Sequence, residues 1–373
     1  MKTLLILALL IPGLALACIN DRDTLAFEKR NVDALNRIEK ETDPRKKSEA
    51  IQELVLRAIG GRFERYPARY YEMRIERLLK KGTLTAPECD DLAVAYDRLG
   101  KIDDAIRILL ASKSSRTAKE EKYSFHANYG TFLVHRWIAK GHKDDDIATL
   151  KMSIAEIKKA LEINPKSHFG RENVQLALEE SWLPHLRSKQ GVVLNKLNSQ
   201  DLLVGSAGII MMGLGYELPD MYENIALTHL RSQASESQLQ NFALLRRNDL
   251  VKAGHQMIYT NSQLPGPSSV ASPEAGSDKS NPRKPYEDLL ADGEKVHVAR
   301  LAYMESRFAR GVHPDTHPDF WSEWVEPPYP VLKRIGGPYS QSPVQMIAGL
   351  VAALVAGIGL LLLRDRIRKK LAR

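Results

Sequence analysis

The feature that most constrains this 373-residue chain is an uninterrupted apolar run near its C-terminus, from Met346 to Leu363. A helix needs about 20 apolar residues to cross the hydrocarbon core of a bilayer. With Val344 included, the run reaches that length, so residues 344–363 are predicted to form one transmembrane helix. The tail that follows, residues 364–373, carries six basic residues and one acidic residue. Positive charge favours the cytoplasmic side, so this basic tail is expected inside the cell.

The N-terminus has the composition of a secretory signal peptide. Lys2 supplies a positive charge, and an apolar stretch from Leu4 to Ala17 follows, broken only by one Pro-Gly pair. The stretch is too short for a comfortable span and ends in small residues, as signal peptides do. Residues 1–17 are therefore predicted to be removed. Together the two ends predict a single-pass protein, placed in a bacterial inner membrane with the bulk of its chain in the periplasm.

The chain has only two cysteines, Cys18 and Cys89, and they leave two alternatives open. The stretch from Ala15 to Cys18 resembles a bacterial lipobox, so Cys18 could be lipidated, which would leave Cys89 unpaired. Simple cleavage after Ala17 would instead allow the two thiols to form one disulfide in an oxidising compartment. We favour simple cleavage, because a second anchor is already predicted.

The net charge of +8 is largely explained by topology. Lys2 and the tail, whose own net charge is +5, leave only +2 for the exported part. So small a positive excess on a large region does not provide the basic surface that nucleic-acid binding needs. We therefore do not expect nucleic acid as a partner.

Between residues 18 and 257, apolar residues recur at intervals of three and four, which predicts an all-α fold. We divide this part into an N-terminal helical region, residues 18–86, and a region of paired helices, residues 87–257. The clearest pair has small and large residues at regular spacing and a glycine at the expected turn. These positions are Leu92, Ala93, Tyr96, Gly100, Ala105 and Leu109.

A second helix pair is predicted between residues 123 and 165. It is irregular, because Trp137 stands where a turn glycine is expected and residues 139–146 lengthen the loop. A third, degenerate pair is predicted over residues 201–233. The spaced positions of the second pair are Tyr129, Gly130, Leu133, Ala160, Leu161 and Pro165.

This spacing resembles the tetratricopeptide repeat, most clearly over residues 87–110 and in the closing stretch 160–165. The resemblance covers roughly half of the exported region. It implies antiparallel helix pairs that stack in series, with small residues at the close contacts and large residues filling the grooves. It also implies a concave surface suited to binding a peptide or another protein. A generic all-α bundle is the alternative fold.

Composition changes near residue 258. Residues 258–285 are rich in Ser, Pro, Gly and Ala, which predicts a flexible linker that cannot bury enough surface to become ordered. Residues 286–341 then begin with a predicted amphipathic helix, Tyr286 to Arg310, and continue as an aromatic and Pro-rich stretch. Its aromatic residues either pack against that helix or form an exposed surface for a partner or the membrane interface. They are Phe320, Trp321, Trp324, Tyr329 and Tyr339.

Nothing in the sequence predicts a catalytic constellation, and no cofactor or metal is expected. The most ligand-like stretch is His313–Asp319, whose His and Asp side chains could bind zinc. Its two prolines favour a polar turn instead. The alternative function is an enzyme or enzyme subunit with a site in residues 120–220, drawn from His126, His135 or His168.

The leading prediction is a membrane-anchored scaffold that binds a protein or peptide partner on the exported side. A homo-oligomer through the transmembrane helix is a further expectation. Gly349, Ala353 and Gly357 recur there every four residues, and small residues at that spacing let helices approach closely.

Overall fold

The computed structural model describes residues 19–23, 38–165, 167–184, 197–212, 215–231, 238–258 and 283–328. Every regular element in these ranges is a helix, which confirms the all-α prediction for this part of the chain. The predicted signal peptide, the predicted span at 344–363 and the basic tail lie outside the described residues, as does most of the predicted linker. Within the described ranges, no helix combines the length and the apolar character that crossing a bilayer requires.

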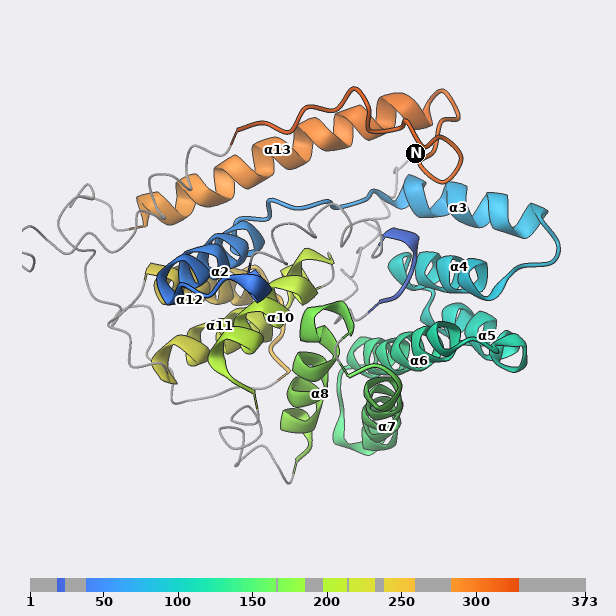
Figure 1. Cartoon of the computed structure of the whole chain (residues 1–373), viewed down its shortest axis with the longest axis horizontal. Coiled ribbons are helices and arrows are strands. Elements are labelled where there is room, and N and C mark those ends of the chain that lie inside the picture. Colours follow the sequence, from blue (N-terminus) through green and yellow to red (C-terminus); the bar gives the residue numbers. More distant parts are fainter. Residues whose placement is uncertain are drawn as a thin grey trace, which may run out of the picture. The chain divides into compact units, whose positions relative to one another are not determined.

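The helices follow one another along the chain, and the connections from α3 to α8 are short (Figure 1). The α-helices are α2 (Pro44–Ile59), α3 (Ala68–Lys80), α4 (Ala86–Arg98), α5 (Ile102–Ala111), α6 (Lys119–Ala139), α7 (Ile147–Ile163), α8 (Arg171–Trp182), α10 (Ser199–Met211), α11 (Pro219–Arg231), α12 (Gln238–Lys252) and α13 (Lys284–Phe308). Short 3₁₀ helices include η1 (Lys113–Ser115), η2 (Asp144–Asp146), η3 (Ser167–Gly170) and η5 (Gly215–Glu217).

Local sequence explains where the first predicted pair begins and turns. Helix α4 starts with a capping box, in which the Thr85 hydroxyl accepts from the Glu88 N–H and the Glu88 carboxylate accepts from the Thr85 N–H. Pro87 lies in the first turn, where its missing N–H costs nothing. After α4, Gly100 adopts φ +73°, a left-handed conformation that glycine reaches without strain. Helix α5 then begins at Ile102.

Consecutive helices pack as antiparallel pairs. Helices α4 and α5 form one pair and α6 and α7 another, and α4 also contacts α6, so that the two pairs are stacked. The order continues through α8, α10, α11 and α12. Helix α2 packs on α10 and α12, far from it in the sequence.

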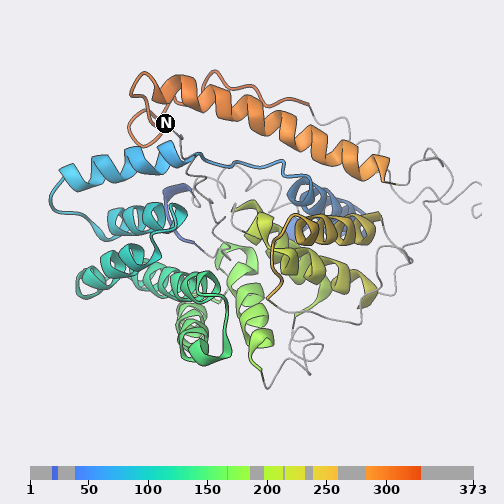
Figure 2. The ribbon, with the colours of Figure 1, turned by 180° about the vertical axis from the view of Figure 1, so that it is seen from behind.

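The segment after the predicted linker packs on the start of the helical region. Helix α13 crosses α2 and runs beside the extended connection between α2 and α3 in both ribbon views (Figures 1 and 2). At the crossing, a Cβ on Gly293 would lie 1.7 Å from the Gly60 carbonyl oxygen, so the two backbones touch. Arg62 pairs with Asp292 at 2.6 Å, and Arg300 donates to the Phe63 carbonyl at 2.7 Å. Residues before and after the predicted linker therefore belong to one compact unit.

The start of α13 differs from the predicted linker boundary. Residues 258–285 were expected to be linker, yet α13 begins at Lys284 with Pro285 in its first turn, a position that proline favours. At the other end, Ile258 is buried and its N–H donates to Asp220 at 3.0 Å. The linker prediction is therefore too long at both ends, and the intervening residues 259–282 lie outside the described residues.

The aromatic stretch folds back onto α13. Phe320 is fully buried, and its carbonyl accepts from the Tyr303 hydroxyl. The Trp321 ring stacks on Tyr303 with an interplanar angle of 12°, and Trp324 meets the same ring edge-on. These three residues thus adopt the packed arrangement, whereas Val325 beside them is 82% exposed. The other two aromatic residues of the stretch lie outside the described residues.

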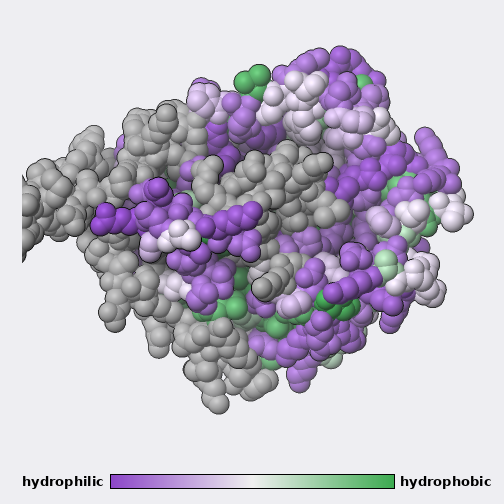
Figure 3. Space-filling view, viewed as in Figure 1, coloured by the Kyte–Doolittle hydropathy of each residue, from purple (hydrophilic) through white to green (hydrophobic). Residues whose placement is uncertain are grey.

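The described surface is mainly hydrophilic on the face shown in Figure 3, with apolar residues in small separate patches. Large exposed apolar side chains come from several different elements. They are Leu79, Leu110, Met152, Val251, Val298 and Val325.

Candidate functional site

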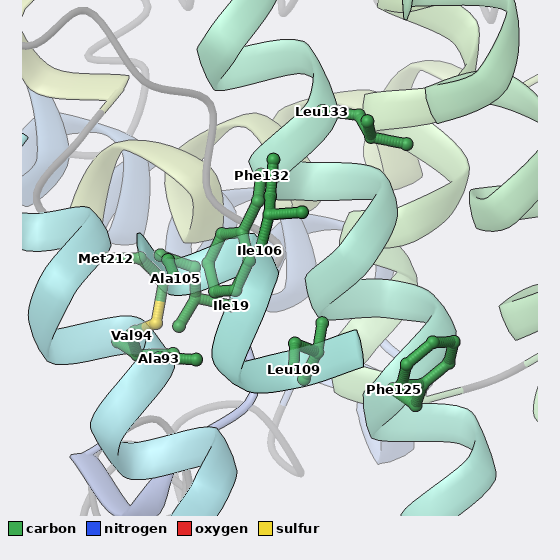
Figure 4. Packing of buried hydrophobic residues seen from close by; sticks show 10 residues of the cluster. All are labelled: Ile19, Ala93, Val94, Ala105, Ile106, Leu109, Phe125, Phe132, Leu133 and Met212. Atoms are coloured by element: carbon green, nitrogen blue, oxygen red, sulfur yellow. The ribbon is translucent and has the colours of Figure 1, made fainter. Parts of the chain in front are cut away.

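The predicted packing positions of the first helix pair lie mostly in one apolar cluster. Ala93, Ala105 and Leu109 are fully buried there together with Leu133 of the second pair. Figure 4 shows Ala93, Ala105 and Leu109 gathered where α4 and α5 meet, and Leu133 further along α6. Because alanine has a small side chain, it lets the helices approach until the larger residues fill the space between them.

The other predicted positions fall at the margin of this cluster or away from it. Tyr96 and Tyr129 are half-buried at its edge, and Leu92 is buried. Leu161 is half-buried and Pro165 is exposed. Leu161 and Pro165 of the closing stretch therefore lie outside the apolar cluster of the first pair.

Two predicted small residues of the second pair lie where α6 and α7 meet. A Cβ on Gly130 would lie 2.8 Å from the Ile157 Cδ1 and 3.1 Å from the Ser153 carbonyl oxygen. Ala160 is fully buried against Tyr123 of α6. The close approach of these two helices thus depends on the missing side chain at residue 130.

A buried polar network crosses the same interface. Glu179 of α8 lies 2.6 Å from the Ser153 hydroxyl and accepts from the Gln175 amide at 2.6 Å. The Ser153 hydroxyl also lies 2.7 Å from the Gly130 carbonyl, to which it can donate its single proton. Burial raises the pKa of Glu179 to about 8. A protonated Glu179 can donate to Ser153 when the Ser153 proton goes to the Gly130 carbonyl. Sequence analysis did not single out this carboxyl group.

The three histidines of the enzyme alternative have separate partners. His126 lies 2.6 Å from a carboxylate oxygen of Glu156, and His135, fully buried, lies 2.8 Å from Asp97. They stand nine positions apart on α6, about 13 Å along the helix axis at 1.5 Å per residue. His168 stacks on Tyr123. These side chains do not converge on one site.

The His313–Asp319 stretch forms a turn against α3. The His313 Nε2–H donates to the Tyr70 carbonyl at 3.0 Å, and its Nδ1 accepts from the Asp315 N–H at 3.1 Å. Both contacts fit a neutral ring, and burial lowers the pKa of His313 to about 4. Among the described residues, no group of three His, Cys, Asp or Glu side chains is arranged to hold a metal ion. The Asp315 side chain instead binds guanidinium groups.

Arg74 on α3 is the centre of a buried ion cluster and has no solvent exposure. It donates to both oxygens of Asp315 at 2.9 and 2.7 Å. It also donates to both oxygens of Asp23 at 2.8 and 3.0 Å, to Tyr70 at 2.6 Å and to Asp21 at 3.4 Å. Burial alone would raise the pKa of Asp315, but the hydrogen bonds and charge of Arg74 hold it well below the usual range.

Two further arginines complete this cluster. Arg77, one turn after Arg74, donates to Asp315 at 2.8 Å. Arg22 donates to Asp91 of α4 through its backbone N–H at 2.9 Å and through its Nε at 2.6 Å. A charge buried without a partner is strongly destabilising. The cluster therefore joins four distant parts of the chain: the N-terminal segment, α3, α4 and the turn after α13.

The N-terminal segment, defined as residues 19–23, is the part that sequence analysis missed. Ile19 is fully buried in the apolar cluster of α4, α5 and α6, beside Ala105 and Phe132 (Figure 4). The Asn20 N–H donates to the Asn128 Oδ1 at 2.7 Å, and the Asn128 Nδ2 donates back to the Asn20 carbonyl at 2.9 Å. One side-chain amide on α6 thus binds both polar atoms of one residue's backbone.

A second ion pair holds Asn128 in place. The Asn128 Nδ2 also donates to the Asp90 Oδ1 at 3.2 Å, and Asp90 accepts from Arg116 at 3.0 and 2.7 Å. Ser124 donates to the same carboxylate at 2.8 Å. Because Asp90 can only accept, this network fixes which end of the Asn128 amide carries the nitrogen.

Of the two cysteines, only Cys89 lies in the described residues. It is on α4, half-buried with a free thiol, and burial raises the pKa of that thiol. Cys18 lies outside the described residues, so its lipidation or cleavage stays a prediction.

Comparisons with known proteins find no match: no family model, no curated protein and no solved structure is similar to this chain. The resemblance to the tetratricopeptide repeat therefore rests on spacing within the sequence alone.

Proposed function

We propose that the protein is an exported, single-pass membrane protein whose stacked helix pairs, of tetratricopeptide-like character, bind a protein or peptide partner in the periplasm. The proposed localisation and topology are supported by the apolar run at 344–363, the basic tail and the signal-peptide composition. The pairs α4–α5 and α6–α7 support the scaffold, because helix pairs stacked in series present a continuous surface to a partner.

One observation carries the binding role. Asn128 binds the N–H and the carbonyl of Asn20 with the two ends of its side-chain amide. Contacts to the backbone give affinity for a peptide, while pockets for individual side chains give specificity. Ile19 packs into the apolar cluster of α4, α5 and α6 next to this contact. The helices therefore carry the chemistry that peptide recognition requires.

The enzyme alternative gains no support from the described geometry. His126, His135 and His168 each contact a different partner, and each contact is one that packing or hydrogen bonding explains. The homo-oligomer through the transmembrane helix remains part of the proposal and depends on the small residues at Gly349, Ala353 and Gly357.

Proximity labelling tests the scaffold role directly. A labelling enzyme is fused to the exported part of the full chain in its native cell, and biotinylated proteins are identified by mass spectrometry. The control fusion keeps the predicted anchor and tail but lacks residues 38–258. We expect at least one exported or membrane protein to be enriched over the control, and equal labelling by both fusions would refute the proposal.

A further inference from the structure

The N-terminal segment is bound in the way that a receptor binds a peptide. Its five residues contact three helices in turn: Ile19 and Asn20 contact α6, Arg22 contacts α4, and Asp21 and Asp23 contact α3. Ile19, Asn20 and Asp21 are all at most 7% exposed. Figure 1 shows this segment, in dark blue, beside α3 and α4.

The groups that bind the segment also have partners outside it. Asn128 keeps its bond to Asp90, and Arg74 keeps both bonds to Asp315. When the partner of a buried polar group is removed, that group normally loses its hydrogen bond, which costs folding free energy. Without the segment, Asn128 would keep Asp90 and Arg74 would keep Asp315 as partners, so neither side chain would lose all its hydrogen bonds.

We propose that the surface formed by α3, α4 and α6 is a peptide-binding site, and that residues 19–23 occupy it as a ligand supplied by the chain itself. This inference rests on the proposed scaffold function and gives it a location and a ligand class. The external partner presents an acidic peptide, with an apolar side chain followed by carboxylates two and four residues later. This is the pattern of Ile19, Asp21 and Asp23.

The acidic character of the partner follows from the charges on α3. Arg74 is buried where two carboxylates of the segment meet it, and Arg77 lies one turn further along. A neutral peptide would leave Arg74 with Asp315 as its remaining carboxylate. Charge-assisted hydrogen bonds are about twice as strong as neutral ones, so carboxylates are selected at this position.

A ligand in the same chain competes at a high effective concentration, on the order of millimolar for short tethers. External peptides therefore bind the wild-type chain weakly, and weakening the internal contact exposes the site. Asp21→Asn with Asp23→Asn does this without touching α3, α4 or α6. The matched control is Asp103→Asn with Asp145→Asn, which removes the same charge from two exposed positions.

The test uses the full chain in detergent and a fluorescent synthetic peptide that copies residues 19–28, followed by anisotropy. We expect the peptide to bind the Asp21→Asn, Asp23→Asn chain at least tenfold more tightly than the wild type or the control. Adding Asn128→Ala to that chain should weaken binding at least tenfold. A peptide carrying the same two Asp→Asn changes should also bind at least tenfold more weakly.

Two outcomes overturn the inference. In the first, the Asp21→Asn, Asp23→Asn chain folds, as judged by circular dichroism and thermal melting, but binds the peptide no better than the wild type. In the second, that chain fails to fold, which would make the segment a fixed part of the core. The scaffold proposal fails separately, when both fusions give equal proximity labelling. A partner labelled by the wild-type chain that excess peptide does not displace would retain the scaffold and exclude this site.

Discussion

Asp315 binds the guanidinium of Arg74 through both carboxylate oxygens, at 2.9 and 2.7 Å, although the two residues are 241 positions apart. The pair joins the turn after α13 to α3. Two parallel N–H···O bonds of this kind combine charge with fixed geometry, which makes them stronger and more specific than a single contact. The helical region and the segment after the linker are thus held together through buried charge.

Replacing Asp315 by asparagine should destabilise the fold. The change leaves Arg74, which is fully buried, with one carboxylate fewer, and breaking a buried pair costs about 3–5 kcal/mol. Chemical denaturation of the purified chain measures this free energy of unfolding. The control is Asp319→Asn, an exposed residue of the same turn. Equal stability losses for the two variants would contradict the role assigned to Asp315.

Glu179 should make stability depend on pH. Its folded pKa of about 8 lies above that of an unfolded glutamate, 4.5, so the native state holds the proton more tightly. The resulting stability is fully present below pH 4.5 and declines by about 1.4 kcal/mol per pH unit until pH 8. Unfolding midpoints of the wild-type chain are therefore expected to fall between pH 5 and pH 8.

Glu179→Gln should flatten that decline. A glutamine amide can donate to Ser153 as the protonated carboxyl does, and its oxygen can accept from Gln175. The variant is expected to be more stable than the wild type at pH 8 and similar to it at pH 5. Glu162→Gln, at an exposed position of α7, should leave the pH profile unchanged. A profile that Glu179→Gln does not alter would show that this carboxyl is ionised in the folded state.

Gly130→Ala should be destabilising because of steric contact. The new methyl would lie 2.8 Å from the Ile157 Cδ1, and overpacking of this kind costs about 1–3 kcal/mol. Ile157→Val removes that Cδ1 atom, so the double variant should lose less stability than the sum of the two single variants. A double-mutant cycle by denaturation measures the coupling. Strict additivity would place the Gly130 effect elsewhere, for example at the Ser153 carbonyl oxygen, 3.1 Å from the new methyl.

The predicted topology can be checked with single cysteines in a Cys18→Ser, Cys89→Ser background. Val325→Cys, at a position 82% exposed, should react with a membrane-impermeant maleimide applied on the exported side. Ala372→Cys in the basic tail should react only after the inner membrane is permeabilised. The reverse pattern would refute the proposed orientation, and labelling of both sites before permeabilisation would refute the anchor.

The features that sequence analysis predicted well are local ones. Helices α4 and α5 are specified by neighbours in the chain: Thr85 and Glu88 cap the first, and Gly100 makes the turn between them. The three- and four-residue spacing of Ala93, Ala105 and their neighbours is visible without a structure because a helix repeats every 3.6 residues. The packing of α13 on α2 left no comparable signal.

The site was harder to predict, because its residues are joined by long-range polar contacts. Asp315 was considered as part of a metal-binding stretch, yet its partners are arginines on α3. The run Asn20 to Asp23 was not singled out by any sequence pattern. Charged residues are usually solvent-exposed, and nothing in the sequence marks a carboxylate that will meet a guanidinium on a helix 50 residues later. The density of Asp and Arg in five residues was the one available hint.

The position of Arg62 has a mechanical consequence. Its guanidinium donates to the carbonyls of Pro327 and Pro328, the last residues before the stretch that leads to the predicted anchor. The same side chain pairs with Asp292 of α13. Tension applied to the chain at Pro328 would therefore be shared between the junction of α2 and α3 and helix α13, through several bonds at once.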